Sequence, residues 1–176
     1  MLNVLNVVRK VSISHTKNSR IVLQLTSIIV NIVMPTSYNI LTIVLDFDGT
    51  VVAHEFPKIG KDIEAIPVLK ELVDNGHKLI LSTMRSNITN PVSKSTNYLT
   101  DAVNWFKKND IPLYGIQVNP TQHKWTTSPK AYGQLYIDDN SLGCPLIYPT
   151  DNSRPYVDWK VVRKLLADKG LFKNDK

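Results

Sequence analysis

The sequence predicts an α/β fold, built on a doubly wound, mainly parallel sheet with helices on both faces. Short apolar runs alternate with amphipathic helical segments from residue 38 to residue 170, which is the order of strands and crossover helices in a parallel sheet. The first run, residues 40–45, is apolar almost throughout, as in strands buried on both faces. With 176 residues, 43% of them hydrophobic, the chain can bury one core and is expected to form one domain.

The positive charge of the chain is concentrated near its start. The formal net charge is +6. Four basic residues precede the first acidic residue, Asp46: they are Arg9, Lys10, Lys17 and Arg20. The rest of the chain holds 17 of the 21 basic residues and all 15 acidic ones, so it is close to neutral. Charge therefore gives no strong indication of a nucleic-acid partner.

We divide the chain into a basic leader (1–37), a domain (38–170) and a short tail (171–176). The apolar run 21–34 in the leader is interrupted by polar residues and is shorter than the roughly 20 apolar residues of a membrane span, so a membrane anchor is disfavoured. A dispensable leader with Met34 as the natural start, a targeting peptide and an export signal remain open. The single cysteine, Cys144, fits a reducing cytoplasm, and we expect it to pack as a small apolar residue.

The first half of the domain is expected to contain two strands and a helix. Residues 40–45 form the first strand, and residues 51–60 an irregular connection. A helix follows, because Ile66, Leu69 and Val73 recur at helical spacing, Pro67 suits a first turn, and Asn75-Gly76 is a stop signal. Residues 79–81 form the second strand, which leads into residues 82–85.

The second half repeats this alternation. Apolar residues at i, i+3, i+4 and i+7 predict a helix that ends near Asn109; they are Leu99, Ala102, Val103 and Phe106. Residues 114–118 and 134–137 are the third and fourth strands. The last helix contains Trp159, Val162 and Leu166, with Asp158 as its N-cap and Gly170 at its end.

Acidic residues follow the first and fourth predicted strands. Asp46 and Asp48 lie one residue apart after the first strand, and Asp138-Asp139 follow the fourth. Carboxylates this close either share a proton or hold a cation between them. Because the carboxyl ends of parallel strands meet at one edge of a sheet, we expect these acids to lie with Thr83 and with Lys130 nearby. Carboxylate oxygens favour Mg2+, so the sequence predicts a site for magnesium and phosphate.

These motifs resemble the haloacid dehalogenase superfamily of phosphohydrolases, and in particular its small members without a cap domain. Residues 46–50, Asp-Phe-Asp-Gly-Thr, match the first motif, and Thr83 matches the second. Lys130, eight residues before Asp138, matches the third, and Asp138-Asp139 match the fourth. The resemblance covers residues 38–148. Asn140 departs from it, since related small proteins often have arginine there.

The resemblance implies a Mg2+-dependent phosphatase that works through an aspartyl-phosphate. Asp46 would be the nucleophile and Asp48 the general acid and base. Thr83 and Lys130 would bind the phosphoryl group and stabilise its charge. Mg2+ would be held by Asp46, by the backbone carbonyl of Asp48, and by Asp138 and Asp139; which of the last two binds directly stays open.

Other residues and partners are less well defined. Arg85 either binds a carboxylate or phosphate of the substrate or only pairs with a surface acid. Lys124 competes with Lys130 for the cationic role. For His54, His123 and Trp125, surface or packing roles are favoured. Neither gap between motifs has room for a cap domain, so we expect an open site, which leaves a homo-oligomer open.

The substrate class stays open between a phosphorylated small molecule and a phosphorylated macromolecular end. Singly, Asp48 and Gly49 could form only a turn, Thr83 could cap a helix and Lys130 could be a solvated lysine. Two non-enzymatic functions remain alternatives, a receiver-like signalling module and a non-catalytic phosphate-binding module. In a receiver, the acidic pair would come early and the lysine last, the reverse of the order here.

Overall fold

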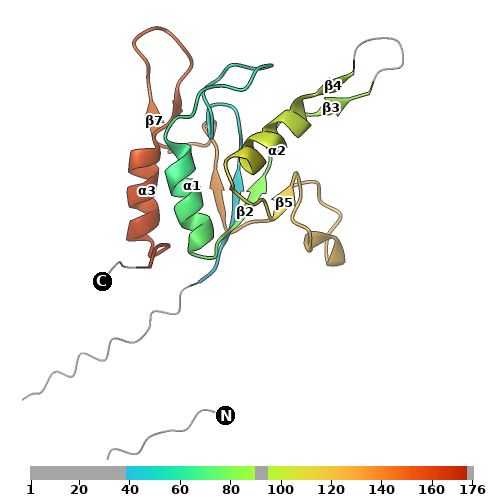
Figure 1. Cartoon of the computed structure of the whole chain (residues 1–176). Coiled ribbons are helices and arrows are strands. Elements are labelled where there is room, and N and C mark those ends of the chain that lie inside the picture. Colours follow the sequence, from blue (N-terminus) through green and yellow to red (C-terminus); the bar gives the residue numbers. More distant parts are fainter. Residues whose placement is uncertain (1–38, 90–94, 174–176) are drawn as a thin grey trace, which may run out of the picture. The chain divides into compact units, whose positions relative to one another are not determined.

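A four-stranded parallel sheet forms the centre of the domain (Figure 1). The computed structural model describes residues 39–89 and 95–173. In the sheet the strand order is β5-β2-β1-β6. The strands are β1 (Thr42–Leu45), β2 (Lys78–Leu81), β5 (Gly115–Ile116) and β6 (Leu135–Ile137). The α/β class and the four predicted strands are thus confirmed.

Three α-helices form where the apolar periodicity predicts them. They are α1 (Ala65–Asp74), α2 (Tyr98–Lys108) and α3 (Trp159–Asp168). The N-cap of α3 is Asp158, whose side chain accepts hydrogen bonds from the amides of Lys160 and Val161, as predicted. Such a cap satisfies amides that have no partner within the helix.

All three helices pack on the same face of the sheet. Ile43 and Leu45 of β1 belong to one core cluster with the buried residues of α1, α2 and α3. Val44, which points to the opposite face, belongs to a second cluster with Ile80 and Ala131. The expected helices on both faces are therefore not confirmed within the described residues.

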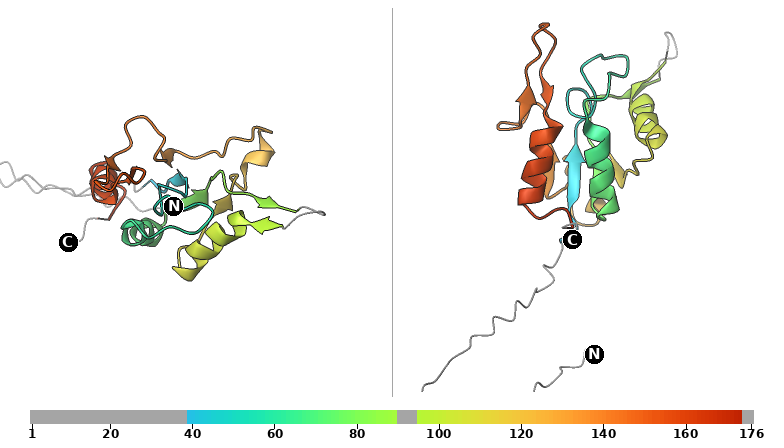
Figure 2. Two further views of the ribbon diagram at one scale, coloured as in Figure 1. Left: turned by 90° about the horizontal axis from the view of Figure 1, so that it is seen from above. Right: turned by 60° about the vertical axis from the view of Figure 1, so that its left-hand side comes forward.

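The connection between β5 and β6 explains this difference. It runs back across the sheet on the second face and, in the described chain, contains only the short 3-10 helix η1 (Gln122–Lys124) (Figure 2). This segment carries two prolines, at 120 and 129, and no apolar residues at helical spacing, so it cannot form an amphipathic crossover helix. From this segment, Ala131 packs on the second face of the sheet, and Tyr114, which precedes β5, packs against the same cluster.

Two small antiparallel hairpins were not predicted. One pairs β3 (Asn87–Ile88) with β4 (Thr96–Asn97), and the other pairs β7 (Leu146–Ile147) with β8 (Tyr156–Val157). Strands of two residues are too short to show an alternating pattern. The β7–β8 hairpin lies beside α3 (Figure 1) and contributes Val157 to the main core.

The domain extends slightly beyond its predicted end. Leu171 is buried in the main core, and its carbonyl oxygen lies 2.7 Å from Nε2 of His77. Cys144 is half-buried and packs against the same core, which confirms its expected packing role. The leader 1–37 lies outside the described residues. No helix of the described chain has the length and apolar character needed to cross a membrane.

Candidate functional site

The carboxyl ends of three strands meet at one edge of the sheet. In the strand register Leu45 is paired with Leu81 on one side and with Ile137 on the other. The amide of Asp46 donates to the carbonyl of Ile137 over 3.1 Å, and the amide of Ser82 donates to Leu45 over 2.8 Å. The residues that follow these strands are therefore fixed side by side, as the predicted topology requires.

In the turn after β1, Asp46 and Asp48 come directly before and after Phe47, a residue of the core. The Phe47 side chain is fully buried in the main cluster, and its carbonyl accepts from the amides of Val51 and Val52. Gly49 has a φ of +84°, a left-handed conformation that glycine adopts without a Cβ clash. A Cβ at this position would lie 2.0 Å from Nε2 of His54. The turn thus needs glycine for both its conformation and its contact.

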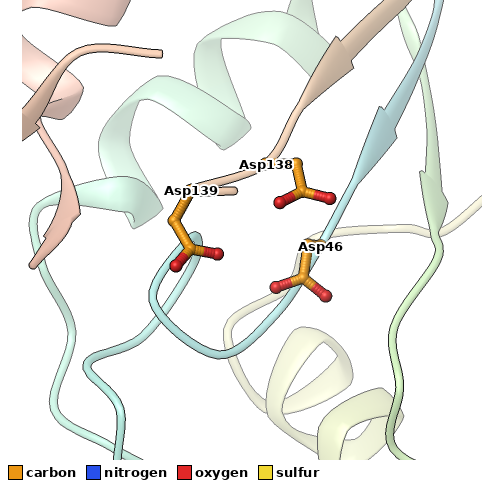
Figure 3. A group of neighbouring side chains, drawn as sticks. All are labelled: Asp46, Asp138 and Asp139. Carbon is orange, nitrogen blue, oxygen red and sulfur yellow. The ribbon is translucent and has the colours of Figure 1, made fainter. Parts of the chain in front are cut away.

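Three carboxylates converge at this edge (Figure 3). One oxygen from each of Asp46, Asp138 and Asp139 lies within 4.8 Å of the others. The buried hydroxyl of Thr50 accepts a hydrogen bond from the amide of Asp139 over 3.0 Å. This hydroxyl also lies 3.5 Å from Oδ2 of Asp46 and 3.4 Å from Oδ1 of Asp139, and can donate to either. Thr50 therefore joins the turn after β1 to the acids after β6.

His54 contacts the same cluster through Asp139. Its Nε2 lies 3.1 Å from Oδ2 of Asp139, and the side chains are 11% and 7% exposed. A carboxylate only accepts hydrogen bonds, so Nε2 carries the proton of this bond. The favoured surface or packing role of His54 was therefore incomplete, because its imidazole fixes an acid of the site.

Burial raises the pKa of Asp46 from its ordinary value of 3.8 to about 7. The backbone amide of Phe47 opposes this shift, and the nearby carboxylates of Asp138, Asp139 and Asp48 add to it. Burial and the neighbouring negative charges both raise the free energy of the ionised form of Asp46. A cation bound between the carboxylates would offset the neighbouring charges and lower the pKa again.

The donor set suits a hard divalent cation. All three clustered side chains offer carboxylate oxygens, and Mg2+ takes one or two such ligands while keeping several waters. No softer ligand, nitrogen or sulfur, is among the clustered atoms of the described residues. Asp46, Asp138 and Asp139 therefore fit the predicted magnesium, and Asp48 is not part of the cluster through its side chain.

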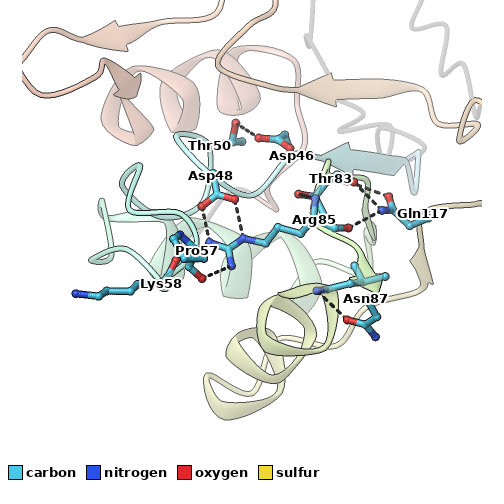
Figure 4. A network of polar contacts seen from close by, with 10 residues as sticks. Asp46, Asp48, Thr50, Pro57, Lys58, Thr83, Arg85, Asn87 and Gln117 are labelled. Atoms are coloured by element: carbon cyan, nitrogen blue, oxygen red, sulfur yellow. Dashed lines mark hydrogen bonds and ion pairs between the residues drawn. The ribbon is translucent and has the colours of Figure 1, made fainter. Parts of the chain in front are cut away.

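Asp48 is held by a buried arginine (Figure 4). Nε of Arg85 donates to Oδ2 of Asp48 over 2.6 Å, and a terminal nitrogen donates to Oδ1 over 2.7 Å. The guanidinium also donates to the carbonyls of Pro57 and Lys58 and lies against the rings of Phe47 and Phe56. Four of its five N–H groups are thus used inside the protein. Arg85 therefore pairs with an acid, but this acid is Asp48 of the site and not the surface acid that was one of the two predicted alternatives.

Thr83 lies at the end of β2 and is held by a residue after β5. Its amide donates to Oε1 of Gln117 over 3.0 Å, and Nε2 of Gln117 donates back to its carbonyl over 2.6 Å. The Thr83 hydroxyl accepts from the amide of Arg85, so its own proton remains for a ligand. The side chain lines the cavity described next.

A cavity of about 460 Å3 opens above these residues. Its lining combines acids, cations and two exposed apolar side chains, and consists of Asp46, Asp48, His54, Phe56, Thr83, Met84, Arg85, Asp138, Asn140 and Arg154. Phe56 and Met84 are 58% and 97% exposed. The cavity therefore combines charged and polar groups with two apolar side chains, which suits an organic ligand with a charged group.

The predicted lysine does not line this cavity. Lys130 is exposed, and its ammonium lies 5.3 Å from the ring centre of Tyr136. Tyr136 is paired with Val44 in the register of β1 and β6, so it points to the second face of the sheet. Lys124, His123 and Trp125 lie in or next to η1 and are also absent from the lining.

Three residues of the site were given no binding role from the sequence. Thr50 could have been found, because it belongs to the motif 46–50 and directly follows Gly49. His54 comes close only because the turn doubles back, and Arg154 only because the β7–β8 hairpin reaches the site. Sequence spacing carries no signal for either of these contacts.

The fold and the site define an α/β protein with a parallel sheet and an acidic cavity at the carboxyl edge of that sheet. One solved structure that matches is described as a conserved protein coded by a locus of Bacteroides thetaiotaomicron. It is 30% identical, the match covers 74% of this chain and 93% of that one, and the TM-score is 0.57. The chain belongs to the same family as this conserved protein, whose description states no activity. No family model and no curated protein matches the chain.

Proposed function

We propose that the chain is a Mg2+-dependent phosphatase of the haloacid dehalogenase type that hydrolyses a phosphate monoester. The observation that supports this most is the convergence of Asp46, Asp138 and Asp139 at the carboxyl edge of the sheet. The strand order β5-β2-β1-β6 is the order expected of a doubly wound core, although the second face carries no α-helix in the described chain. The motif residues follow β1, β2 and β6. The capless form is supported by the open cavity, in which Phe56 and Met84 remain exposed.

In the proposed reaction, an oxygen of Asp46 attacks phosphorus and the bond to the leaving alcohol breaks. The departing oxygen takes a proton from Asp48. Water then attacks the aspartyl-phosphate and gives its proton to Asp48, which releases phosphate and restores both acids. When bound, Mg2+ would supply positive charge that offsets the carboxylates and the phosphoryl oxygens.

The two other proposed phosphate ligands have unequal support. Thr83 lines the cavity and has a hydroxyl proton to donate, so it can bind a phosphoryl oxygen. Lys130 must leave the ring of Tyr136 to reach the cavity, which makes it the least supported member of the proposed site. Asp48 must also release one bond to Arg85 before it can carry a proton.

The proposal is tested with the full chain and a generic aryl phosphate, with and without Mg2+. We expect hydrolysis that requires Mg2+, disappears with EDTA, and is abolished by Asp46→Asn. The matched control is Asp151→Asn, an exposed acid outside the cavity lining, which should keep full activity. Hydrolysis that persists in Asp46→Asn would contradict the assignment of the nucleophile.

A receiver-like or phosphate-binding module is a second candidate, and the Asp48–Arg85 pair favours it. A carboxylate that accepts two guanidinium hydrogen bonds has no proton to give, so phosphorylated Asp46 could persist instead of being hydrolysed. This candidate predicts that acetyl phosphate adds one stable phosphoryl group to the wild-type chain, seen by mass spectrometry, without turnover. Asp46→Asn should then remain unmodified.

A further inference from the structure

Arg154 is a cation of the cavity wall whose guanidinium is not engaged. Its exposed side chain lines the cavity together with the acids. Within residues 39–89 and 95–173, this side chain forms no hydrogen bond or ion pair. Arg85, by contrast, is occupied by Asp48 and two carbonyls. Arg154 therefore differs from the other arginine of the lining in having donors available to a ligand.

The β7–β8 hairpin is bonded to the acidic turn, which brings the loop that carries Arg154 to the cavity. The amide of Val157, three residues after Arg154, donates to the carbonyl of Gly49 over 2.8 Å. Nε1 of the buried Trp159 donates to the carbonyl of Thr50 over 2.7 Å. The strand that follows Arg154 is thus bonded to the same turn that carries Asp46 and Asp48. These bonds hold the chain just after Arg154 at the rim of the cavity, while the guanidinium itself has no salt bridge within the described residues.

We propose that Arg154 is a substrate-binding residue that contacts an anionic oxygen of the ester; this rests on the proposed phosphatase function. Guanidinium groups bind phosphate and carboxylate through two parallel hydrogen bonds. The proposed catalytic lysine, Lys130, lies outside the lining, so Arg154 is the cation positioned to fill that need. The oxygen belongs either to the transferred phosphoryl group or to a second anionic group on the organic part, which would lie near Phe56 and Met84.

The experiment compares phenyl phosphate with 4-carboxyphenyl phosphate, two esters that differ by one anionic group. Both are assayed by phosphate release with the wild type, Arg154→Ala, Arg154→Lys and the control Lys164→Ala, an exposed position on α3. Loss of a charged hydrogen-bond donor weakens binding about tenfold or more. If Arg154 contacts the phosphoryl group, Arg154→Ala raises KM for both esters and the inhibition constant of inorganic phosphate by this factor. If it contacts a second anion, only KM for 4-carboxyphenyl phosphate rises.

Arg154→Lys should recover part of the loss, and Lys164→Ala should match the wild type. Values within twofold of wild type for both esters and for inorganic phosphate in Arg154→Ala would overturn the inference. If the wild type hydrolyses neither ester, the proposed function fails, and the role of Arg154 is decided by calorimetric titration in Mg2+ with inorganic phosphate and with 4-carboxyphenyl phosphate. Weaker binding of either compound by Arg154→Ala then supports the anion contact. Equal binding of both compounds, or no binding of either compound by either protein, overturns it.

Discussion

Both carboxylate oxygens of Asp48 accept hydrogen bonds from the guanidinium of Arg85, at 2.6 and 2.7 Å. The Arg85 side chain is 1% exposed and that of Asp48 is 18% exposed, so the pair is largely shielded from water. It connects the turn after β1 with the segment after β2. The orientation of the proposed general acid is therefore set by a residue 37 positions further along the chain.

Replacing Arg85 by lysine should destabilise the protein. Lysine keeps the charge but cannot form the two parallel bonds to Asp48 or reach both carbonyls. Breaking a buried ion pair costs roughly 3–5 kcal/mol. Because Asp48 is partly exposed, we expect a loss of about 3 kcal/mol in the free energy of unfolding, which urea unfolding measures. Arg154→Lys, an exposed position without a partner in the described chain, should change the free energy of unfolding by no more than about 0.5 kcal/mol. Equal midpoints for the two variants would show that the pair adds nothing to stability.

The metal-free protein should lose stability as the pH rises toward 8. Because the pKa of Asp46 is about 7 in the folded chain against an ordinary value of 3.8, the folded chain binds this proton more tightly than the unfolded chain. The stabilisation from Asp46 is complete below pH 3.8 and is lost as the pH rises through 7. Thermal unfolding in EDTA between pH 4 and 8 measures it.

Asp46→Asn isolates this effect from the other titrating groups. The difference in Tm between wild type and Asp46→Asn should move in favour of the variant as the pH rises through this range. Mg2+ should remove the loss in the wild type, because a bound cation favours the ionised carboxylate. A constant difference in Tm across the range would contradict the raised pKa.

Removing the imidazole of His54 should weaken magnesium binding. His54 holds Oδ2 of Asp139 at 3.1 Å, and loss of a group that orients a metal ligand commonly costs 10–100-fold in affinity. Calorimetric titration of His54→Ala with Mg2+ should show a Kd raised by about this factor. His123→Ala, an exposed histidine in η1, is the matched control and should bind as the wild type does. An unchanged Kd in His54→Ala would mean that Asp139 needs no support.

Gly49→Ala should be more harmful than Gly143→Ala. Both glycines have φ near +85°, so both substitutions add backbone strain of roughly 1–2 kcal/mol. A Cβ at residue 143 would have no atom within 4 Å, whereas one at residue 49 would displace the imidazole of His54. Chemical unfolding should show the larger loss for Gly49→Ala. Only this variant should also weaken Mg2+ binding; equal effects of the two on Mg2+ affinity would argue against the contact with His54.

The strands, helices and clustered acids of this domain were predictable from local sequence. Residues 40–45 and 79–81 are apolar throughout or nearly so, and the helix ending near Asn109 has a clear period, so each element matched its pattern. Asp46 and Asp138 come together because parallel strands share one edge, which is a consequence of topology rather than of side-chain detail. The magnesium and the activity remain predictions.

The missed features depend on contacts between distant segments. For Arg85 the sequence favoured a substrate anion and a surface acid equally, and it gave no sign that Asp48, 37 residues earlier, is the partner. Lys130 satisfied the motif spacing, but spacing does not fix the direction of an exposed side chain, which lies along Tyr136. The strands of the two hairpins have two residues each, which is too short for an alternating pattern to be detected in the sequence. The helices lie on one face because the connection before β6 contains two prolines and lacks apolar residues at helical spacing.

The bonds from Gly49 and Thr50 to β8 and α3 have a consequence for biosynthesis. Thr50 and Trp159 are 109 residues apart in the chain, so the turn emerges from the ribosome well before the residues that support it. Contacts of such long range form late, because the intervening chain must be ordered first. A nascent chain halted before Val157 would carry the complete acidic motif without the backbone partners that shape it. We therefore expect the turn to reach its final shape, and the proposed activity to appear, only after the segment from Val157 to Trp159 has been synthesised and folded.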